Sequence, residues 1–168
     1  MPSGLRKLVL SVHLAVSVGW LGAVGAYMAL DVAAATSEDV RTLRAAYLTM
    51  ERIAGYVIVP LAFATLLTGV VVSLGSRWGL FRHYWVVISL VLTILATVVL
   101  VVETRTIGAL AEAAADPATS DDRLRGLGST LVHSVGGGAV LLAILVLNVY
   151  KPQGLTRYGW RQQRREHR

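Results

Sequence analysis

Histidine is the residue type in this 168-residue chain whose chemistry stands out, because three of the four histidines lie in or beside long apolar runs. Imidazole carries protons near neutral pH and is a common ligand of metals and haem iron. His13 lies well inside the first apolar run, where an ionisable group is costly and therefore marks a functional candidate. Trp20 follows seven residues later on the same helical face, and its flat ring suits the edge of a porphyrin.

His83 stands at the start of the third apolar run and is the candidate for an opposite axial position. Spans one and three of an up-down bundle run in the same direction and lie diagonally, so a haem b between His13 and His83 is one hypothesis. Their depths in the membrane differ by about 7 Å. The alternative interpretation is structural: His13 hydrogen-bonds inside the bundle, and His83 is an interfacial residue beside Tyr84 and Trp85.

His133 begins the fourth apolar run and lies about 15 Å or more in depth from His13, so the two residues are not expected to share a metal. Two carboxylates, Glu51 and Glu103, are expected near the same surface of the membrane. A pair of His133 with either of them predicts an outer polar site for a proton or a cation. The alternative is again an interfacial histidine.

The elements that must position these residues are four apolar segments, each about long enough to cross a hydrocarbon core as a helix. The composition agrees, with 55% hydrophobic and 15% charged residues. The sequence therefore predicts an all-α, polytopic transmembrane up-down four-helix bundle over residues 1–150, followed by a basic tail, 151–168. The predicted spans are 8–30, 53–74, 84–102 and 131–150.

The charges sort by segment and predict the orientation. The N-terminus, the second connection and the C-terminal tail carry ten of the sixteen basic residues and one acidic residue, Glu166. The positive-inside rule therefore predicts that both termini are cytoplasmic. The tail is expected to bind anionic lipid headgroups, with an acidic protein partner as the alternative. Nucleic acid is not an expected partner, because aromatic stacking residues do not alternate with the basic ones.

Several kinds of site are excluded or absent from the sequence. The chain has no cysteine, which excludes disulfides, thiolate metal ligands and covalent c-type haem. Catalytic motifs of the nucleophile–His–acid, phosphate-loop or metalloprotease type are missing, so an enzyme is the less favoured class.

Pro60 predicts a kink in the second span. Small residues at every fourth position from Ser11 to Ala23, and the triplet 136–138, predict close helix packing.

Two segments carry a resemblance to known proteins: WGLFRHYW at 78–85 and KPQGLTRYG at 151–159. With them the chain resembles an uncharacterised family of four-helix integral membrane proteins common in actinobacteria, for which no activity is established. His13 followed by Trp20-Leu21-Gly22 is more distantly similar to the copper-resistance D-type proteins and the membrane protoporphyrinogen oxidase. In those groups span one contributes a histidine to a haem or metal site, which implies that role for His13.

Two functional hypotheses follow for this small integral membrane protein. One is a redox module that binds haem b or a metal through His13 and His83, beside Trp20. The other is a non-enzymatic accessory subunit or scaffold, either a homo-oligomer or part of a larger membrane complex. The sequence leaves the ligand and the partner open.

Overall fold

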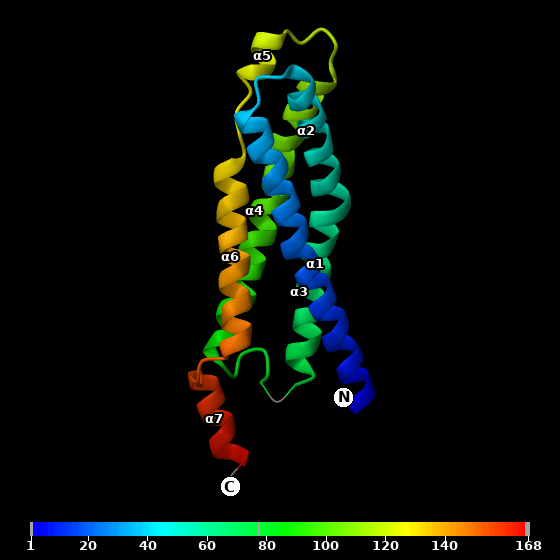
Figure 1. Cartoon of the computed structure of the whole chain (residues 1–168). Helices are drawn as coiled ribbons and strands as arrows, with labels where there is room; N and C mark the ends of the chain where they lie inside the picture. The colour runs from blue at the N-terminus through cyan, green and yellow to red at the C-terminus, as the bar shows by residue number, and fades with distance from the viewer. Residues whose placement is uncertain (1, 77, 167–168) are drawn as a thin grey trace.

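The computed structural model describes residues 2–76 and 78–166, which are helical along most of their length (Figure 1). Three residues of the basic segments, Arg77, His167 and Arg168, lie outside the described residues. The described ranges contain one isolated β-bridge and no strand, so the all-α fold class is confirmed. The elements are α1 (Ser3–Thr36), α2 (Val40–Ile53), the π-helical turn η1 (Ala54–Ile58), α3 (Val59–Leu74), α4 (Tyr84–Ala115), α5 (Asp121–Arg125), α6 (Leu131–Tyr150) and α7 (Arg157–Glu166).

Four helical rods are long and apolar enough to cross a membrane: α1, the continuous α2–η1–α3 rod, α4 and α6. Their most apolar stretches have mean hydropathies of 1.8, 2.4, 2.9 and 2.0. Each predicted span lies inside one of these rods. The first three rods extend beyond their predicted spans, because the helical backbone continues through polar residues after the apolar run has ended. The chain therefore has the architecture of a multi-pass membrane protein.

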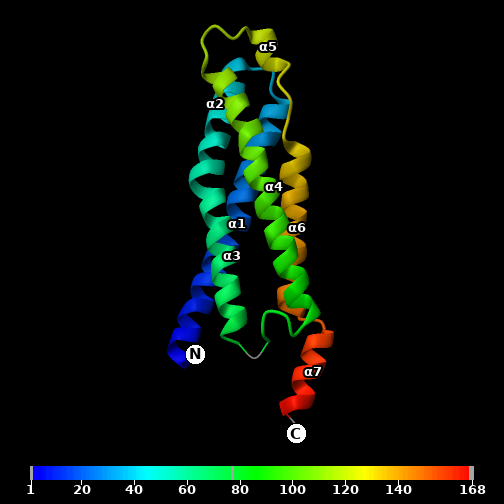
Figure 2. The same cartoon turned by 180° about the vertical axis from the view of Figure 1, so that it is seen from behind.

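The rods form an up-down bundle in which α1 and α4 are diagonal. Helix α1 packs against α2, α3 and α6, and α4 packs against the same neighbours from the other side. Both termini lie at one end of the bundle, below the span ends, and α5 lies at the other (Figures 1 and 2). These two ends are called here the termini end and the α5 end. Helices α5 and α7 stand outside the four-rod bundle, one at each end.

The kink predicted at Pro60 takes the form of a π-helical turn. Proline lacks the N–H that an α-helix needs at that position, and its ring crowds the preceding turn. The turn η1 accommodates this by widening the helix, so that Val59 N–H donates to the carbonyl of Ala54 five residues earlier. The α2 and α3 segments therefore remain one rod. Such π-helical turns are frequent at functional sites.

Burial concentrates toward the α5 end. The buried residues of α1 are Trp20, Tyr27, Asp31 and Ala34, all in its C-terminal half. They pack with buried residues of α2, η1 and α4, such as Met50. The N-terminal half of α1 exposes large apolar side chains, as expected of helix surface that contacts lipid.

The small-residue ridge on α1 does not make the close packing predicted for it. Ser11, Ala15 and Gly19 are exposed, and only Ala23, at the end of the ridge, is partly buried and packs against the core. A Cβ added at Gly19 would meet only Leu61, at an ordinary 3.7 Å. Close packing occurs instead at Gly138 of α6, where an added Cβ would lie 3.1 Å from Met28. Most of the ridge lies outside the buried face of α1, because that face is set by the bulky residues Trp20 and Tyr27.

Candidate functional site

A cavity of about 250 Å³ lies between α4 and α6, in the half of the bundle toward the α5 end. Helix α1 and the turn η1 contribute to its wall, the latter through Ala54 and Ile58. Most lining side chains are apolar. Several polar exceptions, among them Glu103 of α4 and His133 of α6, lie toward the α5 end. An apolar cavity with a few polar groups at one end is the usual form of a small-molecule site.

Glu103 and His133 are brought together by the bundle. Glu103 Oε1 lies 3.4 Å from His133 Nε2, and the side chains are 20% and 55% exposed. His133 is positioned by the first turn of α6, in which the backbone N–H of His133 donates to the carbonyl of Thr130. The other carboxylate oxygen, Glu103 Oε2, is buried and has no hydrogen-bond partner among the described residues. Glu51, the alternative partner predicted for His133, is exposed on α2.

Trp20 lines the same cavity from α1. Its side chain is only 3% exposed, and its indole Nε1 has no hydrogen-bond partner in the described part of the chain. Buried polar atoms are nearly always paired, so an unpaired one needs an explanation. The cavity is therefore lined by two residues with unpaired polar atoms of opposite kind: an N–H donor on Trp20 and a carboxylate acceptor on Glu103.

Behind the cavity lies a buried carboxylate, Asp31, whose exposed fraction is 0%. Its oxygens accept three hydroxyl hydrogen bonds: from Ser129 at 3.1 Å, Thr130 at 2.8 Å and Ser134 at 2.9 Å. The Thr130 hydroxyl also lies 3.0 Å from Tyr27 OH. Since the single Thr130 proton is directed to Asp31, Tyr27 donates to Thr130. These bonds fasten the end of α1 to the start of α6 at the edge of the cavity.

Sequence reasoning missed Asp31, because the first predicted span, 8–30, ends just before it. The signal was present, because Asp31 follows Trp20 by eleven residues and Tyr27 by four. Those spacings place it on the same helical face as both aromatic residues. The position of Asp31 at the end of a span suggests exposure, but its place on the same helical face as two large aromatic residues predicts burial. The second signal is the stronger one here.

The predicted haem residues lie in three separate surroundings. His13 packs on α3, where its Nδ1 is 3.0 Å from Thr68 Oγ1 and a Cβ at Gly69 would lie 3.1 Å from its ring. His83 Nδ1 donates to the Trp78 carbonyl at 2.8 Å, at the termini end. Trp20 lines the α4–α6 cavity. Trp20 and His83 line different cavities and His13 lines neither of them, so a haem held by His13 and His83 stays a prediction. The described residues also contain no cluster of three or more side chains of the kind that holds a metal ion.

Comparison with family models, with curated proteins and with solved structures finds no match for this chain. The resemblances noted from the sequence therefore stay predictions.

Proposed function

We propose that this small integral membrane protein binds a neutral amphipathic molecule, taken from the bilayer into the α4–α6 cavity. The observation that carries the proposal is the pair of unpartnered buried atoms, Trp20 Nε1 and Glu103 Oε2, on residues that line one apolar cavity. An unsatisfied buried polar group costs about 1–3 kcal/mol. A ligand hydroxyl can remove the penalty at either atom, because a hydroxyl can accept from the Trp20 N–H or donate to the Glu103 carboxylate.

The cavity also restricts the size and charge of the ligand. A volume of about 250 Å³ is just below the range of about 300–1,000 Å³ for pockets that enclose drug-sized molecules. It holds a head group or a short chain, and a longer tail must extend into the bilayer. The carboxylate of Glu103 disfavours a second anion in a poorly solvated place. The favoured class is therefore an alcohol or a phenol with an apolar body, rather than a fatty acid.

Lateral access is provided by the glycines of α6. A Cβ added at Gly136 or Gly137 would meet no atom within 4 Å, although both residues line the cavity. Val132, in the first turn of the same helix, is 82% exposed. These glycines were predicted to pack against a neighbouring helix. Their open surroundings support a role as an entrance from the lipid side.

A photoactivatable long-chain alcohol tests the proposal, with the corresponding fatty acid as the charged control. In purified protein, we expect the alcohol to label α4 and α6 around the cavity in preference to the exposed half of α1. Gly137→Leu fills the entrance and should reduce this labelling severalfold. Gly22→Leu is the matched control, since Gly22 is equally open but lies outside the cavity lining. Trp20→Phe removes the N–H donor together with part of the indole ring, and should weaken binding at least about two- to tenfold.

Uniform labelling of all lipid-facing surfaces, unaffected by Gly137→Leu, would contradict the proposal. That result would favour the accessory-subunit or scaffold hypothesis. The haem-binding redox module stays a prediction from the sequence, because no contact among the described residues favours it over the proposed cavity ligand.

The proposed location is a bacterial inner membrane, with the termini end in the cytoplasm. The segregation of basic residues supports this orientation. Cysteines introduced at Ser3 and Ser76 should resist an impermeant thiol reagent in intact cells, and cysteines at Ser37 and Ser120 should react. The chain has no cysteine of its own, so the background is clean. The opposite labelling pattern would reverse the orientation and place the cavity near the cytoplasmic surface.

A further inference from the structure

The C-terminal segment folds back onto the loop before α4 at the termini end. Tyr84 N–H donates to the carbonyl of Gly154 at 3.2 Å, and Thr156 N–H donates to that of Arg82 at 3.0 Å. The Thr156 hydroxyl donates to the carbonyl of Phe81 at 2.6 Å. Two segments about seventy residues apart are thus held in register, just where α4 begins. A fixed surface of this kind can carry a binding site.

An open pocket of about 670 Å³ lies between these two segments. Its charged lining residues are Arg82 and Lys151, and no carboxylate lines it among the described residues. His83 and Trp78 form another part of the wall, with the His83 ring held edge-on against Trp78 at 5.0 Å between ring centres. The His83 Nδ1 bond to the Trp78 carbonyl fixes the ring further. The pocket therefore combines cationic groups with an aromatic wall.

Lys151 has a left-handed backbone conformation, which glycine adopts more easily than lysine does. It ends α6 in the left-handed region, at φ 45° and ψ 59°. Glycine is usual at this position after a helix, because a side chain makes the conformation less favourable. The lysine ammonium lies 6.0 Å from the centre of the Trp78 ring, at the pocket. A side chain kept in an unfavourable backbone conformation beside a pocket points to a role for its charge.

Gln163 of α7 contributes the remaining polar group. Its side-chain carbonyl, Oε1, is buried without a hydrogen-bond partner in the described residues, and Gln163 lines the pocket. An unpaired acceptor calls for an N–H or O–H donor. The pocket thus offers positive charge and, separately, an acceptor that needs a donor.

The pocket lies at the level of the lipid headgroups. The third membrane rod starts at Tyr84 and Trp85, next to the pocket wall, and aromatic residues of this kind mark the membrane–water interface. We propose that the pocket binds the headgroup of phosphatidylglycerol. The phosphate lies against Lys151 on the side lined by Arg82, and a glycerol hydroxyl donates to Gln163 Oε1. Phosphatidylcholine has the same phosphate but no O–H or N–H donor, so it satisfies only half of the site.

Short-chain lipids added to the full-length protein in detergent test this assignment. Dihexanoyl phosphatidylglycerol, below its micelle concentration, should raise the melting temperature more than dihexanoyl phosphatidylcholine does. Lys151→Gly should weaken the phosphatidylglycerol effect at least tenfold in concentration, as for loss of a charge-assisted hydrogen bond. It should not lower the melting temperature without lipid, because glycine suits the backbone there. Gln163→Leu should reduce the preference for phosphatidylglycerol over phosphatidylcholine.

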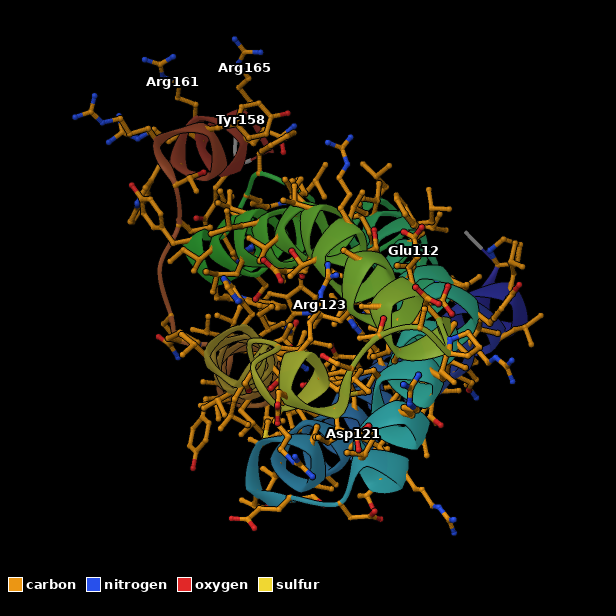
Figure 3. The ribbon with its side chains drawn as sticks, turned by 90° about the horizontal axis from the view of Figure 1, so that it is seen from above. Glu112, Asp121, Arg123, Tyr158, Arg161 and Arg165 are labelled. Atoms are coloured by element: carbon orange, nitrogen blue, oxygen red, sulfur yellow. The ribbon has the colours of Figure 1, made fainter. Side chains whose placement is uncertain are left out.

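Arg161→Gln is the control for general attraction between the basic tail and anionic lipid. Arg161 is exposed on α7 and projects away from the bundle, as does Arg165 (Figure 3). Its replacement should leave the lipid effect unchanged. An equal loss with Arg161→Gln, or an equal response to the two lipids, would overturn the pocket as a headgroup site. The same stabilisation by inorganic phosphate at matched ionic strength would overturn the lipid as the source and leave free phosphate as the ligand.

Discussion

Replacement of Asp31 by alanine is the strongest test of how the α5 end is held together. The carboxylate is fully buried and accepts hydrogen bonds from Ser129, Thr130 and Ser134. Hydrogen bonds to a charged group contribute about 1.5–3 kcal/mol each, but burial of the carboxylate itself costs several kcal/mol. The net effect is therefore smaller than the sum of three bonds.

The loss of stability in Asp31→Ala depends on which other group each of the three hydroxyls can hydrogen-bond to. Ser129 is exposed and can turn to water. Ser134 already lies 3.1 Å from the carbonyl of Leu131, which can accept its proton. Thr130 is buried and is left with Tyr27 alone, so one hydroxyl is stranded, at about 1–3 kcal/mol. With the small cavity left by the lost carboxylate, we expect Asp31→Ala to cost about 2–4 kcal/mol.

The assay is unfolding of the purified protein in detergent, by heat and by titration with a denaturing detergent. At about 2–4 °C per kcal/mol for a chain of this size, the melting temperature should fall by roughly 4–16 °C. Asp31→Asn keeps one acceptor oxygen and should cost about half as much. Ser129→Ala should change stability by less than about 1 kcal/mol, because that hydroxyl is exposed. A stability for Asp31→Ala within about 0.5 kcal/mol of wild type would refute this account of the cluster.

Three further substitutions test other contacts. Gly159→Ala places a Cβ against the Arg82 carbonyl oxygen, so the tail should detach and be cleaved faster by trypsin while the bundle melts unchanged. Arg44 donates three hydrogen bonds to backbone carbonyls at the end of α4 and beyond it, and Arg44→Lys should lower the free energy of unfolding by about 1–3 kcal/mol. The hydrogen bond from the Thr42 hydroxyl, with those from backbone N–H groups, lowers the pKa of Asp39, which caps α2. Its stabilising effect is thus complete at neutral pH and lost as pH falls through that lowered pKa. The protection factors for amide exchange in the first turn of α2, relative to the intrinsic rate at each pH, should therefore fall in acid, but not in Asp39→Asn.

The four spans follow from the sequence alone, because the free energy of placing a segment in lipid is a sum over its own residues. The irregular helical turn before Pro60 also follows from the sequence, because the N–H that proline lacks would have bonded within the same helix. What stayed undetermined was the face that each helix turns to its neighbours. The small residues from Ser11 to Ala23 predicted one packing face for α1, whereas the bulky residues Trp20 and Tyr27 form the face that is buried.

The candidate site depended on that rotation and so required the tertiary structure. His13 and Trp20 share a helical face, but seven residues of rise, about 10 Å, separate them. Over that distance the neighbour of α1 changes, so His13 contacts α3 while Trp20 lines the α4–α6 cavity. Local sequence also predicts Glu51 and Glu103 at the same end of the bundle. Only the packing of α4 against α6 directs Glu103 to His133, while Glu51 stays exposed on α2. Side-chain partners across a bundle depend on the rotation and spacing of the helices, and no single segment of the sequence determines these.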